Sequence, residues 1–280
     1  MTQALLFLRR LIRRRIVLLG VIILMVMILA AIFAPLIAPY DPNKIAVMQR
    51  LKPPSAVNWL GTDEYGRDLL SRIIYGARAS MGIGAAIVVI SVICGTLMGL
   101  IAGYFEKLDG VIMRFVDAFM SLPDILLAIF LVAVLGGSAG NVILALSIVY
   151  TPRVARVVRA STLVVREQPY VEAARALGVA PWRIIGVHIL LNVTSPVLVQ
   201  ATFIFAYAVL AEAGLSFLGA GVPPEIPTWG TIIAASQSYS DKALWLVLFP
   251  GLAIMLSALS LQLVGDGLRD MLDPRLRKSL

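Results

Sequence analysis

Cysteine, histidine and charged residues are all scarce in this chain of 280 residues. The only cysteine, Cys94, excludes an intrachain disulfide, and we expect it to be an inert buried thiol. The only histidine, His188, argues against a metal site or a catalytic constellation, and we expect it to be a packing residue. The nucleotide-binding sequence G-x-x-x-x-G-K-[ST] is missing as well. We therefore expect a protein that is not an enzyme.

The low charge also excludes a soluble globular protein. Charged residues make up 14% of the chain and hydrophobic residues 60%, with a mean hydropathy of +0.92, whereas soluble domains have about 25% charged residues. A helix needs about 20 apolar residues to cross a bilayer, and strands of a membrane barrel would alternate in polarity. Five long uncharged runs without alternation are present, at 16–40, 79–105, 125–152, 184–211 and 243–265. We predict an all-α, multi-pass membrane protein.

The placement of basic residues sets the number of spans and their orientation. The run at 125–152 contains the turn-forming cluster Gly136–Asn141, so we divide it between two spans. The six predicted spans are 16–38, 80–104, 114–135, 141–158, 189–211 and 243–265. With both termini in the cytoplasm, the inner segments then hold 17 of the 24 Lys and Arg residues, as the positive-inside rule requires. The net charge of +8 thus reflects orientation in the membrane, and we expect no nucleic-acid partner.

The chain divides into three predicted regions. Residues 1–40 form a basic cytoplasmic N-terminus and the first span, which is too long for a signal peptide. Residues 41–78 form an outer, periplasmic segment with an interfacial helix, capped by Thr62 or Asp63. Residues 79–280 form a five-helix core with a cytoplasmic loop at 160–188 and an outer loop at 212–242, where Trp229 is a plausible interface anchor.

The cytoplasmic loop at 160–188 has the pattern of a short capped helix. Pro169 suits the first helical position, Glu172 falls in the first turn, and Gly178 ends the segment. A second short helix begins at Pro181 and continues into span five. From these residues alone, a helix bound to anionic lipid is an open alternative to a surface that docks another protein.

Specific motifs resemble a known family. Glu172-Ala173-Ala174-x-x-x-Gly178, followed by His188-Ile189-Leu190, resembles the EAA loop of ABC-importer permeases. Three further stretches resemble the C-type permease subunits of dipeptide and oligopeptide importers: Leu60-Gly61-Thr62-Asp63-x-x-Gly66-Arg67-Asp68, Leu215-Ser216-Phe217-Leu218-Gly219-x-Gly221-Val222-x-Pro224, and Gly265-Asp266-Gly267-Leu268-Arg269-Asp270-x-Leu272-Asp273-Pro274-Arg275. One departure is Leu191, where the EAA pattern usually has proline.

This resemblance implies a fold, partners and an EAA site. The fold would be the MetI-like type I ABC-importer permease fold, in a bacterial inner membrane. The partners would be a homologous second permease, two P-loop ATPases that bind ATP and Mg, a periplasmic or lipid-anchored solute-binding protein, and membrane lipid. The chain itself would hold no cofactor. The residues that couple it to the ATPases would be Glu172, Ala173, Ala174, Arg175 and Gly178.

Polar residues in the spans are candidates for the translocation pathway. A helix from Ile189 to Glu212 covers about 36 Å, so we place Glu212 at the outer mouth of span five, where it would meet a cationic peptide amino group. A solvated or capping role for Glu212 is the alternative. Asn141, Gln200 and Tyr207 are further candidates, each of which could instead join helices by hydrogen bonds.

Two alternatives to peptide import are open at this point. Related permeases carry nickel, glutathione or other small solutes, although the scarcity of His and Cys disfavours a metal. A self-sufficient secondary transporter is the other alternative, but paired intramembrane charges for ion coupling and an inverted repeat are not evident in the sequence.

Overall fold

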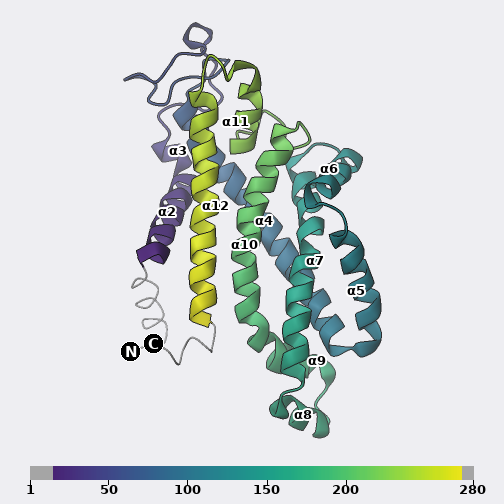
Figure 1. Ribbon diagram of the computed structural model, residues 1–280. Coiled ribbons are helices and arrows are strands. Elements are labelled where there is room, and N and C mark those ends of the chain that lie inside the picture. Colours follow the sequence, from purple (N-terminus) through teal and green to yellow (C-terminus); the bar gives the residue numbers. More distant parts are fainter. Residues whose placement is uncertain (1–14, 273–280) are drawn as a thin grey trace.

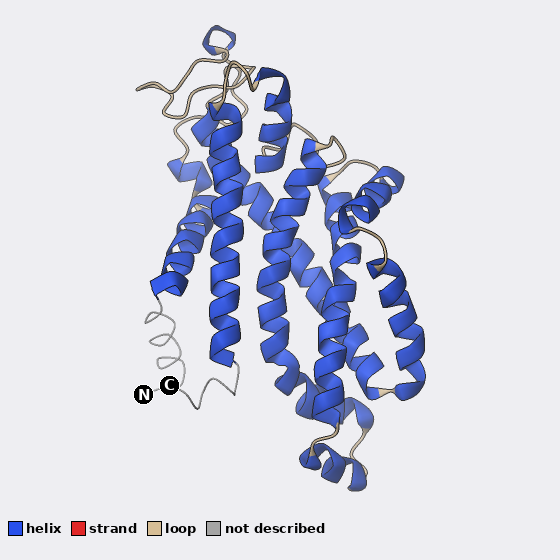
Figure 2. Ribbon diagram, viewed as in Figure 1, coloured by secondary structure: helices blue, strands red, loops and turns tan. Residues whose placement is uncertain are grey.

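The computed structural model describes residues 15–272, and nearly all of its regular structure is helical (Figures 1 and 2). Two 3₁₀ turns lie at Val47–Gln49 and Gln237–Tyr239, and a π-helical segment, η2, spans Ile184–Ile189. The α-helices are α2 (Arg15–Ile32), α3 (Ala34–Ile37), α4 (Leu69–Tyr104), α5 (Glu106–Met120), α6 (Asp124–Leu135), α7 (Ala139–Arg166), α8 (Pro169–Ala176), α9 (Pro181–Arg183), α10 (Leu190–Phe217), α11 (Trp229–Ser236) and α12 (Trp245–Leu272).

Five helical segments of the described chain are long and apolar enough to cross a membrane. They are α2, α4, α7, the continuous α9–α10 segment and α12. Helices α5 and α6 together make a sixth, but they meet at an angle of 93°. The six predicted spans are therefore found if this bent pair counts as one.

The helices form a row crossed by one long helix (Figure 1). Along the row stand α2, α12, α10, α7 and the α5–α6 pair, each packed against the next, while α4 crosses behind and contacts α2, α10 and α7. Helix α2 begins, and α12 ends, towards the same side of the bundle as α8. We call this side the α8 end. The opposite side, which carries α11 and the segment 38–68, is the α11 end.

Glycines allow α4 to pack closely against α7. Gly95, Gly99 and Gly103 recur every fourth residue, so they share one face of α4. A Cβ atom placed on Gly99 would lie 2.6 Å from both the carbonyl oxygen of Ala155 and the Cβ of Val158. Small residues of this kind let helix backbones approach one another in membranes, where the hydrophobic effect does not drive association.

The structure corrects several predictions. The span predicted at 114–135 is interrupted at 121–123. The interfacial helix predicted within 41–78 is the outer end of α4, whose cap is Asp68 and not Thr62 or Asp63. Trp229 is buried in the bundle and does not anchor an interface.

The prediction that Cys94 is a buried thiol is also wrong, because its side chain is exposed. It lines an apolar cavity of about 370 Å³ between α4, α5 and α7. A helix residue in a long apolar run need not be buried by protein, since the bilayer is itself an apolar solvent.

Candidate functional site

Helix α8 forms the tip of the α8 end, beyond the other helices (Figure 1). Pro169 occupies its first turn, as predicted, and Gly178 follows its end with φ +74°. The backbone N–H of Gly178 donates to the carbonyl of Arg175, and the N–H of Val179 donates to that of Ala174. These bonds satisfy the last carbonyls of the helix, and the left-handed conformation suits glycine. The predicted helix and its glycine terminus are confirmed.

One face of α8 is held by the bundle. Val171 and Ala174 are buried. The guanidinium of Arg175 lies 5.4 Å from the ring centroid of Tyr104 at the end of α4, a distance at which a cation is attracted to the ring. The rings of Tyr170 and His188 lie 6.3 Å apart. Helix α8 is therefore tied to α4 and to the segment that leads into α10.

The opposite face of α8 is open. Glu172 and Ala173 are exposed, and the carboxylate of Glu172 makes no hydrogen bond or ion pair with any residue between 15 and 272. Beside them, Leu177 is 84% exposed and Trp182 is 75% exposed. Large apolar side chains that stand open in this way indicate a surface for another protein or for the membrane. Of the predicted coupling residues, Glu172 and Ala173 lie on this open surface, whereas Ala174 is buried. Arg175 is exposed, and its guanidinium reaches the ring of Tyr104.

Along α7, basic residues pair with acidic residues of α5 and α6. The guanidinium of Arg159 donates from Nη2 to Oδ2 of Asp109 (2.6 Å), and the Nε donates to Oδ1. The other pairs are Arg153 with Asp124, Arg156 with Asp117 and Arg166 with Glu106. Sequence reasoning missed this set because it used these arginines only as inner positive charges that set the orientation and sought no acidic partners for them. Their antiparallel order along the chain, 106–109–117–124 against 166–159–156–153, is the signal that could have found them.

Glu212 was predicted to lie at the outer mouth of span five, but it is completely buried. Its Oε1 accepts hydrogen bonds from Ser216 Oγ (2.9 Å) and Thr228 Oγ1 (2.8 Å), and its Oε2 accepts one from Ser80 Oγ (3.3 Å). Ser80 Oγ also accepts from the backbone N–H of Trp229 (3.1 Å). The carboxylate therefore joins α4, α10 and the start of α11. The predicted position at an open mouth is wrong, because Thr228 and Trp229 fold over this end of α10.

The other predicted pathway residues do not form one site. Asn141 donates from Nδ2 to the carbonyls of Leu135 (2.7 Å) and Gly136 (3.0 Å), so it closes the turn between α6 and α7. Gln200 lies partly buried on α10. Tyr207 is exposed, and its ring lies 5.4 Å from the guanidinium of Arg153.

At the α11 end, the segment 60–68 folds around Asp63. Its Oδ1 accepts from the backbone N–H groups of Tyr65 and Arg67 (2.9 Å each), and its Oδ2 accepts from Arg67 Nε (2.6 Å). Trp245 Nε1, at the start of α12, donates to the carbonyl of Thr62 (3.3 Å). The motif at 60–68 thus attaches this segment to the bundle.

Glu64 in the same segment is buried beside charged neighbours. Burial raises its pKa above the ordinary value of 4.5, and repulsion from Asp63 adds to this rise. Its own backbone N–H, Arg67 and Arg72 act in the opposite direction and lower the pKa.

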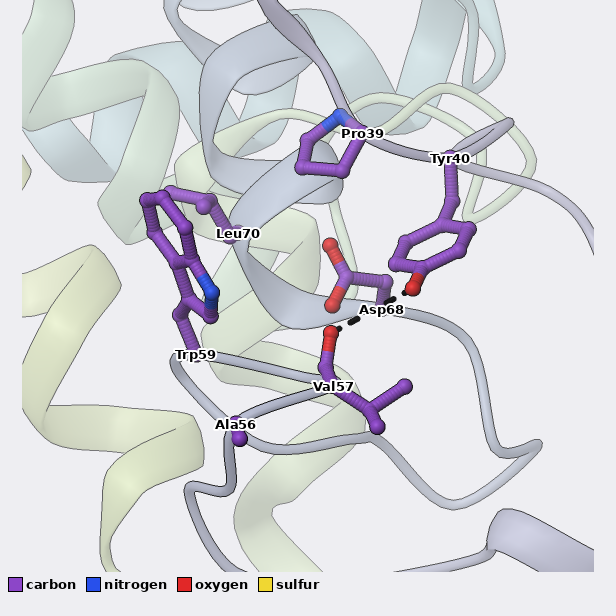
Figure 3. Close-up of a pocket in the computed structure, with 7 residues that line it drawn as sticks. All are labelled: Pro39, Tyr40, Ala56, Val57, Trp59, Asp68 and Leu70. Atoms are coloured by element: carbon purple, nitrogen blue, oxygen red, sulfur yellow. Dashed lines mark hydrogen bonds between the residues drawn. The ribbon is translucent and has the colours of Figure 1, made fainter.

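A cavity of about 350 Å³ opens beside this segment (Figure 3). Asp68 and the apolar side chains of Tyr40, Val57, Trp59 and Leu70 are among its lining residues, and the hydroxyl of Tyr40 donates to the carbonyl of Val57 (3.3 Å). Trp59 is 69% exposed, so the α11 end also presents an open aromatic side chain.

Comparison with known proteins finds family models and relatives that are all transport permeases. Residues 91–278 match the family model described as "Binding-protein-dependent transport system inner membrane component", and residues 2–54 match the "N-terminal TM domain of oligopeptide transport permease C". A Brucella suis protein with the provisional name peptide transport system permease protein is 50% identical over 96% of this chain and 91% of its own length. A Pseudomonas aeruginosa protein named as a di/tripeptide transport system permease is 46% identical over 89% of this chain and 84% of its own length.

A solved structure of the MetNI methionine ABC transporter in inward-facing conformations contains a similar chain. The TM-score is 0.60 at 19% sequence identity, and the match covers 72% of this chain and 96% of that one. At this identity the similarity concerns the fold.

Proposed function

The chain belongs to the family of binding-protein-dependent transport system inner membrane components, and from this premise we propose that it imports peptides as half of a translocation pathway. It is a multi-pass permease subunit of an ABC importer. Peptides are the proposed cargo because relatives at 46–50% identity are named for peptide transport. Nickel and glutathione remain alternative cargoes within the same class of importer.

The observation that carries this proposal is the placement of α8. The helix projects beyond the spans, is held on one face by α4 and η2, and presents Glu172 and Ala173 on the other. An ATPase that binds this face would move the spans when it closes, provided that its contacts differ between the two states. In this proposal two P-loop ATPases supply ATP and Mg binding, and this chain performs no catalysis.

The two ends of the molecule suggest its orientation in the membrane and the place of the solute-binding protein. The α8 end faces the bacterial cytoplasm, because the positive-inside rule places both basic termini there. A solute-binding protein docks on the α11 end, where Trp59 and Val57 are exposed. A homologous second permease supplies the other half of the pathway.

Purification and reconstitution test this function. We expect the tagged chain, extracted from its native membrane in mild detergent, to bring with it a second permease and two ATPases. In vesicles, the complex should take up a dipeptide only when ATP and the binding protein are both present. A stable oligomer of this chain alone, with no ATPase even after cross-linking, would contradict the proposal and favour a secondary transporter.

A further inference from the structure

The junction between α5 and α6 breaks a span. The connecting residues Ser121, Leu122 and Pro123 are exposed in the single chain, and the two helices meet at 93° (Figure 2). Irregular backbone at membrane depth is tolerated only where other protein covers it or where it lines a water-filled cavity. The junction therefore faces a partner or an aqueous path, and not lipid.

A charged and aromatic cluster lies directly beside this junction. Asp124, the first residue of α6, accepts a hydrogen bond from Arg153 Nη2 of α7. The guanidinium of Arg153 lies 5.7 Å from the ring centroid of Tyr150 and 5.4 Å from that of Tyr207 on α10. The hydroxyl of Tyr150 donates to the carbonyl of Tyr207 (3.3 Å). We call Asp124, Arg153, Tyr150 and Tyr207 the junction cluster.

The junction cluster is open on one side and lies midway along α7. Arg153 stands 14 residues after the start of α7 and 13 before its end, which is about 20 Å from either. The side chains of Arg153 and Asp124 are 32% and 38% exposed, and Tyr207 is 43% exposed. Exposing such charges to lipid would be costly, and charged groups within spans face the bundle interior or water.

The pair also retains unused hydrogen-bonding capacity. A guanidinium has five N–H donors, and a carboxylate has about four acceptor positions. Arg153 and Asp124 exchange one hydrogen bond. The pair of Arg159 with Asp109 differs, because its two parallel bonds occupy one edge of the guanidinium and both oxygens of the carboxylate. The Arg159 pair fastens α5 to α7, whereas the Arg153 pair can take further partners.

We propose that the junction cluster is a binding site on the pathway for a zwitterionic peptide. Arg153 binds the peptide carboxylate, Asp124 binds its amino group, and Tyr207 offers a ring face to the chain between them. The cluster thus offers a partner to each charge of the peptide. After release, Arg153 and Asp124 pair with one another, as they do in the structure. This inference rests on the proposed function and adds a site to it.

Transport by the reconstituted complex tests this site. The variants are Asp124→Asn and Arg153→Gln, with Asp109→Asn as the matched control, because it removes the same charge from the neighbouring pair. Uptake of a radiolabelled dipeptide is measured at saturating binding protein. We expect Asp124→Asn and Arg153→Gln to lower the maximal rate about tenfold, as for loss of a charged hydrogen bond, with the half-saturating concentration unchanged because the binding protein sets it. Asp109→Asn should stay within about twofold.

A direct contact measurement accompanies the kinetics. A dipeptide with a benzophenone side chain is taken up by the wild-type complex under illumination. The permease is then digested, and the fragments that carry the cross-linked dipeptide are identified. We expect adducts on α6, α7 or α10 beside the junction cluster, and fewer adducts in Asp124→Asn. Arg153→Lys, which keeps the charge, should restore part of the uptake that Arg153→Gln loses.

The outcomes separate the two proposals. If the wild-type complex takes up no peptide, the proposed function itself fails. If the wild type transports peptide but Asp124→Asn and Asp109→Asn reduce uptake equally, or the adducts lie away from the junction cluster, the binding site is overturned. A variant that does not assemble is replaced by Arg153→Lys, for which partial uptake with labelled cluster residues supports the proposal and unlabelled cluster residues contradict it.

Discussion

At the scale of single residues, Glu212 shows how a buried carboxylate can hold a membrane protein together. Its three hydroxyl donors come from α4, α10 and the cap of α11. Glu212→Ala leaves the hydroxyls of Ser80 and Ser216 without an acceptor, whereas Thr228 Oγ1 can still donate to Thr231 Oγ1. Each unsatisfied buried polar group costs about 1–3 kcal/mol. We expect thermal unfolding of the purified complex to shift to markedly lower temperature in Glu212→Ala, and by less in Glu212→Gln, which keeps one acceptor. Equal stability of Glu212→Ala and wild type would contradict this role.

Gly178 depends on its backbone conformation and not on space. A Cβ atom added there would meet nothing within 4 Å, but φ is +74°. Gly178→Ala should therefore destabilise the end of α8 by roughly 1–2 kcal/mol, measured as faster hydrogen exchange of the α8 amides. Gly110→Ala is the control, since a Cβ at Gly110 also meets nothing within 4 Å and lies inside helix α5. If both variants exchange alike, backbone strain does not explain Gly178.

Glu64 gives the α11 end a pH dependence. Its pKa is raised in the folded protein, mainly by burial, so the folded state binds a proton more tightly than the unfolded state. The contribution of Glu64 to stability is then fully present below the ordinary pKa of 4.5 and is lost as pH rises through the raised value. We expect Glu64→Gln to flatten this part of the profile of unfolding temperature against pH. An unchanged profile would contradict the assignment.

At the scale of elements, the contact between α4 and α7 depends on the stripe of glycines. Gly99→Ala would place a Cβ 2.6 Å from both the Ala155 carbonyl and the Val158 Cβ, and such overpacking costs about 1–3 kcal/mol. Gly82→Ala in the same helix meets nothing within 4 Å and should stabilise it by about 0.5–1 kcal/mol. We expect opposite shifts in the unfolding temperature of the complex. Shifts of the same sign would contradict the packing argument.

Elements with local signals could be predicted from the sequence, whereas tertiary pairings could not. Pro169 and Gly178 bound α8 in sequence and in structure, because caps depend on neighbouring residues. The break at 121–123 was not predicted, because hydropathy does not detect a bend within a span. Pro123 is the local signal for it, since proline disfavours a helical conformation at the preceding Leu122. The burial of Glu212 and Trp229 depends on α4 and α11, which lie far apart in the chain.

At the scale of the whole molecule, the proposed coupling surface and the proposed peptide site lie on connected elements. Helix α8 directly follows α7, which carries Arg153. A displacement of α8 therefore acts on the helix that forms one wall of the junction cluster. This connection gives the ATPases of the proposed assembly a mechanical route to the proposed peptide site.

Reversing the exposed charge on α8 should interrupt this route. We expect Glu172→Lys to insert and assemble normally but to separate ATP hydrolysis from uptake, because it changes the docking face and not the bundle. Glu106→Lys is the control, since Glu106 is an exposed acid at the α8 end outside the loop, and its surface ion pair contributes little. The measurement is peptide taken up per ATP hydrolysed in vesicles, and wild-type uptake by Glu172→Lys would refute the coupling role.

The central claim is that α8 is the surface through which an ATPase drives this permease, and photo-cross-linking tests it most directly. A photoreactive amino acid is placed at Ala173 on the open face of α8 and, as a control, at Trp59 on the α11 end. The native membrane is illuminated, and the adducts are identified by mass spectrometry. The account predicts an adduct between position 173 and a P-loop ATPase, and no ATPase adduct from position 59. Lipid adducts alone at position 173 would contradict it, because α8 would then be an interfacial helix.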